Sequence, residues 1–352
     1  MGSLPAHPHD HAVVIGVRRY ADSPAGWVSD LQGPDNDAEA VAEWLQKADG
    51  GGLPAANVRV ARSALAPDPF PSGGAEPHQS GVMQVLDDLA QLPKNQVDGQ
   101  YAGRRLYVYV SGHGWSRDRG DAALITAEAT KASPANVLVS DWIAWMINAA
   151  PFQELVLWAD MCATVDDQTA FQRCALPKKR SGNQHKVKVF TAFAAQLSLI
   201  AVEAEMADKK WHGAFTYALL QGLAGAAAGA VTSDSLRDYL RNNMKSFMRP
   251  DQLSQLTVAQ EPAFGTTDPM EFAPLLTPAF KVTLTLPQSC VGQPATIGTT
   301  RSAPPAAAVA ALAATDWEVE LQAGHYAVYV DGPEITLPFT VPGGGDVAVT
   351  VP

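Results

Sequence analysis

Residues 155–159 (LVLWA) form an uninterrupted apolar run that ends abruptly at Asp160 and Cys162. The run is too short for a buried helix and has the length of a strand that is covered on both faces. Open α/β sheets carry their chemistry at the carboxyl ends of such strands. A buried and inert cysteine is the simpler interpretation of a single thiol, because cysteine is among the most buried residue types. Whether Cys162 is chemically active depends on a partner elsewhere in the chain.

Apolar runs and helical patterns alternate along the first three quarters of the sequence. Strand-like runs lie at residues 11–17, 57–61, 106–110, 154–160 and 187–193, and apolar residues recur at helical spacing between several of them. Ser140 or Asp141 could cap one of these helices. Alternating strands and helices are typical of a parallel sheet with right-handed crossovers. The sequence therefore predicts an α/β fold, with a mostly parallel sheet and helices on both of its faces.

The hydrophobic period changes to two from about residue 279. Alternating apolar residues between Gly and Pro turns, without a helical stretch, predict a small antiparallel β-sandwich. The Ala- and Pro-rich stretch 303–314 would be a long loop inside it. Pro274 and Pro278 mark the change, so we expect domains at residues 1–275 and 276–352.

The net charge of -11 and the sequence pI of about 5.1 argue against nucleic acid or an anionic membrane as a partner. Three widely spaced cysteines suit a reducing compartment better than a disulfide framework. The first residues lack the pattern of a signal peptide, and no apolar run is long enough for a membrane helix. We expect a cytoplasmic protein.

A histidine follows another predicted strand in the same way that Cys162 follows its own. His113 lies between Gly112 and Gly114, directly after the run 106–110. Neighbouring parallel strands would bring this imidazole and the thiol to one edge of the sheet, where the imidazole can take the proton of the thiol. A core histidine bonded to a carbonyl is the alternative, but the paired strand ends favour a site.

Four segments resemble the caspase–metacaspase clan of cysteine peptidases, in a prokaryotic version, over roughly residues 11–272. They are residues 31–38 (LQGPDNDA), 109–114 (YVSGHG), 160–162 (DMC) and 213–219 (GAFTYAL). The separation of 49 residues between His113 and Cys162 is also the caspase spacing. Metacaspases commonly continue the cysteine motif with His-Ser-Gly, whereas residues 163–165 are Ala-Thr-Val here, so the chain resembles a divergent branch.

The resemblance implies a mechanism and a specificity. Cys162 would attack the scissile carbonyl, His113 would protonate the leaving amine, and the N–H groups of Gly114 and Cys162 would form the oxyanion hole. Asp160 and Asp37 match the acids that line a pocket for basic side chains in metacaspases. We therefore expect cleavage after Arg, with Lys second. For Asp37, a carboxylate at a helix start is an equal alternative.

The polar segment 163–186 corresponds to the loop that many clan members cleave on activation. The candidate self-processing sites in it are Arg173, Lys178, Lys179 and Arg180, although a solvated basic loop is the usual meaning of such a charge run. Asp166 and Asp167 resemble a calcium-assisting pair of some metacaspases, but two adjacent acids do not define a site. We expect no cofactor and no metal. His212, near the expected pocket, has no assigned role.

The resemblance thus implies a regulated bacterial cysteine endopeptidase that acts on proteins or peptides, with an upstream activator as a possible partner. A catalytically silent caspase-like scaffold that binds partners through its β-domain is the alternative. A flavodoxin-like nucleotide binder would need a glycine-rich loop after the first strand, where residues 17–20 are Val-Arg-Arg-Tyr. The β-domain is equally well explained as a structural cap or as a docking surface.

Overall fold

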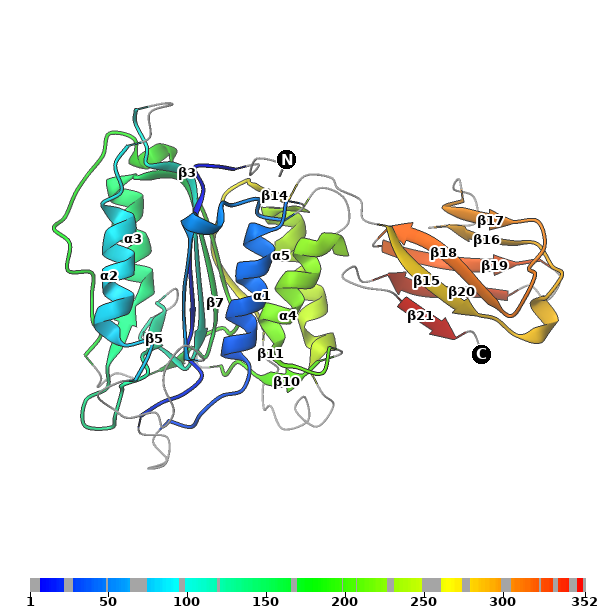
Figure 1. Ribbon diagram of the computed structural model, residues 1–352, viewed down its shortest axis with the longest axis horizontal. Coiled ribbons are helices and arrows are strands. Elements are labelled where there is room, and N and C mark those ends of the chain that lie inside the picture. The colour runs from blue at the N-terminus through cyan, green and yellow to red at the C-terminus, as the bar shows by residue number, and fades with distance from the viewer. Residues whose placement is uncertain are drawn as a thin grey trace. The chain divides into compact units, whose positions relative to one another are not determined.

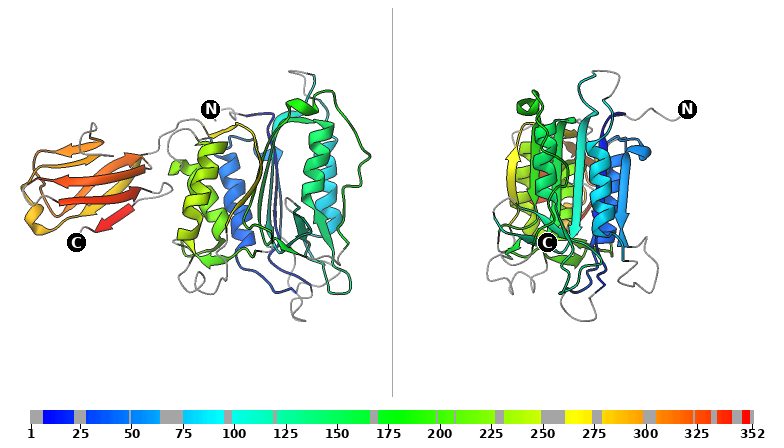
Figure 2. Two further views of the ribbon diagram at one scale, coloured as in Figure 1. Left: turned by 180° about the vertical axis from the view of Figure 1, so that it is seen from behind. Right: turned by 90° about the vertical axis from the view of Figure 1, so that its left-hand side faces the viewer.

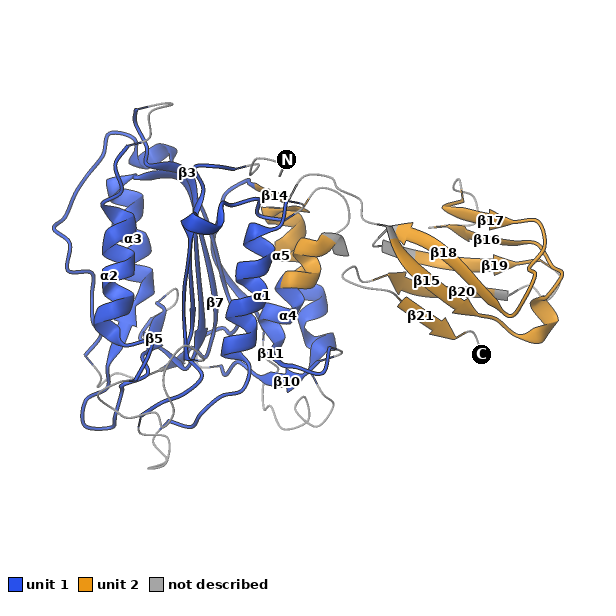
Figure 3. Cartoon of the chain, viewed as in Figure 1, with its two compact units in different colours: residues 1–219, 240–270 blue, residues 220–239, 271–352 orange. Residues whose placement is uncertain are grey.

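The computed structural model describes residues 7–21, 28–48, 50–63, 75–94, 99–118, 121–165, 170–197, 199–206, 208–226, 231–248, 261–273, 279–298, 305–322, 324–331, 335–341 and 347–350. Its contacts divide the chain into one unit of residues 1–219 and 240–270 and a second of residues 220–239 and 271–352 (Figure 3). The predicted boundary between residues 275 and 276 lies outside the described residues. The division into domains at that point stays a prediction.

A six-stranded sheet forms the centre of the first unit, in the order β13-β9-β7-β3-β1-β2. Its strands are β1 (His11–Gly16), β2 (Val58–Arg62), β3 (Gly103–Gly112), β7 (Phe152–Met161), β9 (Lys188–Phe193) and β13 (Ala263–Thr267). Five strands pair in parallel, and β13 pairs antiparallel with β9 at the edge of the sheet. The predicted α/β fold with a mostly parallel sheet is confirmed.

Helices cover both faces of this sheet (Figure 1, Figure 2). One face carries α1 (Pro34–Gln46) and α4 (Ala214–Gln221), and the other carries α2 (Gln79–Ala90) and α3 (Val139–Ala149). A further helix, α5, spans Ser233–Asn243. The prediction that Ser140 or Asp141 caps a helix is wrong, because α3 already begins at Val139. The Ser140 hydroxyl instead accepts the N–H of Ala122 at 3.2 Å.

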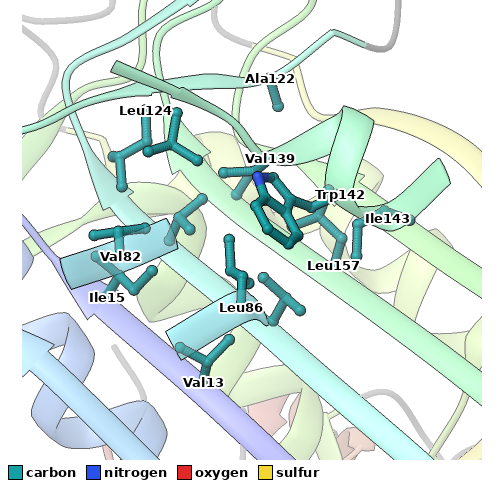
Figure 4. Close-up of a cluster of buried hydrophobic side chains, with 14 of the residues drawn as sticks. Val13, Ile15, Val82, Leu86, Ala122, Leu124, Val139, Trp142, Ile143 and Leu157 are labelled. Atoms are coloured by element: carbon teal, nitrogen blue, oxygen red, sulfur yellow. The ribbon is translucent and has the colours of Figure 1, made fainter. Parts of the chain in front are cut away.

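Alternate apolar residues of the strands form a core with apolar residues of the helices α2 and α3 on one face of the sheet (Figure 4). Leu157 of β7 and Leu86 of α2 are each 1% exposed, and Trp142 of α3 is 0% exposed. Burying such a side chain contributes roughly 1.5–3 kcal/mol. Strands β3 and β7 are therefore packed against helices on this face as well as on the face of α1 and α4, and the positions of their carboxyl ends follow from that packing.

Short strands surround the carboxyl edge of the sheet. They are β4 (Gly114–Ser116), β5 (Ala123–Ile125), β6 (Asn136–Leu138) and β8 (Thr164–Val165), which form one sheet, and the antiparallel pair β10 (Glu203–Glu205) and β11 (Trp211–Gly213). None of these lies among the strand-like runs predicted above. Segments of two or three residues are too short to display a period.

The second unit contains the predicted all-β region. Its strands are β12 (Val231–Thr232), β14 (Glu271–Ala273), β15 (Ala279–Thr285), β16 (Ala295–Gly298), β17 (Ala307–Val309), β18 (Asp316–Gln322), β19 (Gly324–Val330), β20 (Ile335–Val341) and β21 (Val347–Thr350). Sheets in the orders β18-β15-β21 and β17-β16-β19-β20 share a core with Val282 and Val328. The all-β prediction is confirmed, with two corrections. The expected loop 303–314 contains β17, and β15 pairs in parallel with β21.

None of the helices within the described residues has the length and the apolar character needed to cross a membrane.

Candidate active site

Cys162 and His113 lie at neighbouring strand ends. Strands β3 and β7 pair in parallel, and their last residues, Gly112 and Met161, are opposite each other in the register. His113 directly follows β3, and Cys162 directly follows β7. Both side chains line one cavity of about 80 Å³ and a second of about 290 Å³. The two residues that the sequence assigned to catalysis therefore meet at the carboxyl edge of the sheet.

The imidazole of His113 is held by a backbone carbonyl. Its Nε2 lies 2.8 Å from the carbonyl oxygen of Ser29. A carbonyl only accepts, so Nε2 carries the proton and Nδ1 is left as the basic nitrogen. Burial lowers the pKa of His113, which favours the neutral imidazole that a general base requires. The sequence indicated no third member of the site, because Ser29 lies 84 residues away on a segment without periodicity.

The backbone before His113 has a special conformation. Gly112 has a φ of 153°, and a Cβ there would lie 2.9 Å from the Tyr20 hydroxyl. That hydroxyl accepts the N–H of His113 at 2.8 Å and donates to the carbonyl of Val17 at 3.0 Å. Glycine at position 112 thus allows the backbone conformation and the close approach of Tyr20 from which His113 begins, as expected for this residue type.

The thiol of Cys162 is partly covered by the segment 199–202. The N–H of Ala201 donates to Sγ at 3.3 Å, and the N–H of Ala163 donates to the carbonyl of Leu199 at 3.0 Å. Burial, and after it the charge of Asp160, raises the pKa of the thiol. The thiol is therefore protonated at neutral pH in this state, and a base is needed to make it a nucleophile.

Gly114 is packed against the cysteine segment. The N–H of Ile125 donates to the carbonyl of His113 at 3.0 Å, and Gly114 is opposite Leu124. This is the pattern of a non-hydrogen-bonded pair, so the N–H of Gly114 points away from β5. A Cβ at Gly114 would lie 2.6 Å from Met161 Sδ and 2.8 Å from the carbonyl of Cys162. Only glycine fits this position without displacing Cys162.

Asp160 is a buried acid in the smaller of these two cavities and is 5% exposed. Its Oδ2 accepts the N–H of Thr216 at 3.0 Å and the hydroxyl of Thr216 at 2.6 Å, in the first turn of α4. Burial, and after it the neighbouring charge of Asp37, raises the pKa of Asp160 to about 7. A cation in the cavity would favour the ionised form of Asp160 and would donate a strong, charge-assisted hydrogen bond to it.

Asp37 lines the same cavity and is 0% exposed. Its Oδ1 lies 2.8 Å from Nδ1 of His212, and its Oδ2 accepts the N–H of Gly213 at 3.0 Å. Burial raises the pKa of Asp37 to about 6, against the opposing effect of His212. The N-cap of α1 is Gly33, and Asp37 is an acid in the first turn of this helix. The expected carboxylate at a helix start is thus observed, although Asp37 does not cap the helix, and the same side chain also lines the cavity.

Glu203 is a third acid of this cavity that the sequence did not reveal. Its Oε2 accepts the N–H groups of Gln32 at 2.9 Å and Gly33 at 2.8 Å. It thereby joins the first residue of β10 to the loop before α1, some 170 residues earlier. Neither segment has a hydrophobic period, so nothing in the sequence indicated this contact.

Three of the four candidate processing residues, Lys178, Lys179 and Arg180, lie away from the thiol. The side chains of Arg173, Lys178, Lys179 and Arg180 are all exposed. Their segment runs along α3 from its first turn to its last. The N–H of Cys174 donates to Asp141 at 2.8 Å near the start of the helix. Further along, the indole of Trp145 donates to the carbonyl of Pro177 at 2.9 Å, and the N–H of Ser181 donates to the carbonyl of Asn148 at 2.8 Å. Lys178–Arg180 therefore lie near the amino edge of the sheet (Figure 1).

Within the described residues, no group of three or more His, Cys, Asp or Glu side chains is arranged to hold a metal ion. Asp166 and Asp167, the pair considered for calcium, lie outside the described residues.

A thiol and an imidazole on adjacent strand ends of an α/β sheet are the arrangement of a cysteine peptidase. A model of the caspase domain matches residues 9–269. The chain belongs to the caspase-domain family of cysteine peptidases. The predicted resemblance to this clan is confirmed.

A probable protease from a Desulfuromonadales bacterium is 26% identical over 248 residues, which cover 65% of this chain and 27% of that protein. The match thus spans about a quarter of that relative. Caspase-1 from Spodoptera frugiperda has 12% identity and a TM-score of 0.47, with 78% of this chain and 94% of that chain covered. A crystal structure of a protein from Geobacter sulfurreducens has 16% identity and a TM-score of 0.44, with 74% and 94% covered.

Proposed function

We propose that this protein is a cysteine endopeptidase that cleaves proteins or peptides after Arg, and less efficiently after Lys. The observation that carries the proposal is one cavity lined by three carboxylates as well as by Cys162 and His113. The carboxylates belong to Asp37, Asp160 and Glu203. A substrate cation in this cavity would present its carbonyl carbon to the thiol. The planar guanidinium of Arg can bridge two carboxylates, which the single ammonium of Lys does less well.

In the proposed reaction, Nδ1 of His113 takes the thiol proton and the thiolate of Cys162 attacks the carbonyl carbon. The N–H groups of Gly114 and Cys162 bind the developing oxyanion. The C–N bond then breaks, His113 returns the proton to the leaving amine, and a thioester remains on Cys162. A water molecule deprotonated by His113 hydrolyses the thioester and restores the thiol.

Fluorogenic peptides that differ only in the residue before the scissile bond test this proposal. We expect kcat/KM to fall in the order Arg, Lys, citrulline, with Arg about 100-fold above citrulline, because citrulline keeps the shape but loses the charge-assisted hydrogen bonds. Asp-ended peptides should be cut no faster than citrulline peptides. Equal rates for wild type and Cys162→Ala on every peptide would remove the peptidase proposal and favour the silent scaffold.

The proposal includes self-processing in the basic segment, with another copy of the chain as the cutting enzyme. Ser181, the residue after Arg180, is bound to Asn148 in the last turn of α3, so Lys178–Arg180 lie toward the end of the helix, on the far side from the thiol. A chain can reach its own Lys178–Arg180 only after the segment leaves α3. Another molecule meets three exposed basic side chains without such a rearrangement. Arg173, beside Asp141 at the start of α3, is closer to the carboxyl edge.

Mixing tagged Cys162→Ala protein with untagged wild type is expected to give cleavage of the tagged chain after residues 178–180. The initial rate should rise in proportion to the wild-type concentration, and mass spectrometry of the fragments identifies the bond. A tagged Cys162→Ala chain that also has Gln at 178, 179 and 180 is the matched control and should stay intact there. Cleavage of wild type at a concentration-independent rate, with the tagged chain intact, would contradict intermolecular processing.

Three free cysteines, Cys162, Cys174 and Cys290, support the proposed cytoplasmic location in a bacterium, because reducing compartments keep thiols unpaired. Regulation by an upstream activator is also proposed. It is supported by the segment 199–202, which partly covers the thiol through the N–H of Ala201 and would have to move aside for a substrate to reach it.

A further inference from the structure

His212 of β11 lies between two carboxylates. Its Nδ1 lies 2.8 Å from Asp37 Oδ1, and its Nε2 lies 3.0 Å from Asp208 Oδ2. The imidazole is 4% exposed, whereas the side chain of Asp208 is 45% exposed. A chain of polar contacts therefore leads from solvent through Asp208 and His212 to Asp37, which lines the acidic cavity.

The two carboxylates favour the charged form of His212. A neutral imidazole has one N–H donor, and an ionised carboxylate can only accept, so both contacts are satisfied when both ring nitrogens carry protons. Burial opposes this charge, but the hydrogen bonds to Asp37 and then to Asp208 outweigh it and raise the pKa of His212. The pair Asp37–His212 is thus an ion pair beside the cavity.

Strand β11 lies beside all three acids of the cavity. Gly213 donates its N–H to Asp37, and a Cβ at this glycine would collide with the carboxylate of Asp160. His212 is opposite Ala204 in the pairing of β10 with β11, which places Glu203, the first residue of β10, beside the same pair of strands. The dipeptide His212–Gly213 therefore binds the carboxylate of Asp37 directly and lies against the other two acids.

We propose that His212 is a positioning residue for substrate specificity, which holds Asp37 toward the cavity in its ionised form and so sets the affinity for a basic side chain. This inference rests on the proposed function. His212 touches neither the substrate nor the reacting atoms, so its effect is expected on KM and on the pH at which KM changes. The value of kcat should change little.

The direction of the pH effect follows from the groups around His212. Those facing it are Asp37 from α1, Asp208 from the preceding turn and the ring of Tyr217 from α4. More distant charges act through these carboxylates: Glu203 and Asp160 interact with Asp37, and Lys210 with Asp208. Loss of the imidazolium leaves Asp37 buried among acids, so its pKa rises and it stays protonated to higher pH.

The test is KM and kcat for an Arg-ended peptide from pH 6 to 9, with wild type, His212→Gln, and His185→Gln as a matched exposed control. In His212→Gln we expect KM to rise about tenfold at pH 7 and to return to within about threefold of wild type at pH 9, since one pKa unit is a tenfold change in protonation. Asp208→Asn should shift the KM profile in the same direction by less. His185→Gln should match wild type.

Alkylation of Cys162 by iodoacetamide is expected at the same rate in wild type and His212→Gln. Equal rates would show that the substitution changes the binding of the basic side chain and not the reactivity of the thiol. A KM raised by one constant factor at every pH, or a fall in kcat without a change in KM, would refute the positioning role. If His212→Gln does not fold, Asp208→Asn decides, and an unshifted KM profile there is also a refutation. Failure of wild type to cut Arg-ended peptides counts instead against the proposed function.

Discussion

Replacing Cys162 with Ala is expected to lower kcat/KM for an Arg-ended peptide by at least about 10⁴-fold, because no other group in the site can form the thioester. His113→Ala should cause a loss of similar size, since the pKa of the thiol is raised by burial and the thiol needs a base. The double variant should be no worse than either single one, because the two residues act as a unit. Steady-state hydrolysis assays measure all three effects.

Cys174→Ala is the matched control, since Cys174 is also half-buried and its pKa is also raised by burial. It should keep wild-type activity. Full activity of Cys162→Ala, or a double variant that loses far more than either single variant, would contradict the assigned roles of Cys162 and His113.

Asp160→Asn is expected to do two opposite things: to remove most activity on Arg-ended peptides and to stabilise the fold. The amide introduced by this substitution keeps an oxygen that accepts from Thr216, but the cavity loses a charge. KM for an Arg-ended peptide should therefore rise about 100-fold or more, while activity on a citrulline-ended peptide changes little. An equal loss on both peptides would show that Asp160 acts on catalysis and not on the substrate cation.

The stability gain depends on pH with a defined sign. The pKa of Asp160 is raised by burial to about 7 from 3.8, so between these values the folded state binds more protons than the unfolded state. The contribution of Asp160 to wild-type stability is thus expected to fall as pH rises from about 4 to 7, with a loss on the order of 4 kcal/mol above pH 7. Asp160→Asn lacks this loss.

Urea unfolding at pH 4.5 and pH 8 measures the difference. We expect Asp160→Asn to exceed wild type in free energy of unfolding at pH 8 and to approach it at pH 4.5. Asp88→Asn, a substitution on α2 outside the active site, is the control and should follow wild type at both values. A destabilised Asp160→Asn at pH 8, or a gap that does not depend on pH, would mean that burial does not penalise this carboxylate.

The parts of the fold that the sequence revealed are those with a long apolar period. The runs that end before His113 and Cys162 belong to strands of 10 residues each, and parallel pairing then places both ends at one edge. The same reasoning located Asp160, two residues before the cysteine. These features are local in sequence, and the parallel pairing of the two strands is enough to bring the residues at their ends together.

The features that escaped sequence reasoning are long-range contacts between short segments. Ser29 holds His113 across 84 residues, Glu203 reaches Gly33 across 170, and His212 reaches Asp37 across 175. The strands that carry Glu203 and His212 have 3 residues each, too few for a period-two pattern. Tertiary packing alone brings these groups to the site, so no local sequence pattern predicts them.

Covalent labelling with a peptide chloromethyl ketone that ends in Arg tests the central claim most directly. The thiolate displaces chloride and forms a thioether, so intact mass should rise by one peptide reagent minus HCl. We predict one adduct per wild-type chain, located on Cys162 by peptide mapping, absent in Cys162→Ala, and formed at least about tenfold more slowly with an Asp-ended reagent. Adducts on Cys174 instead, or equal rates for the Arg- and Asp-ended reagents, would contradict a basic-specific cysteine nucleophile at position 162.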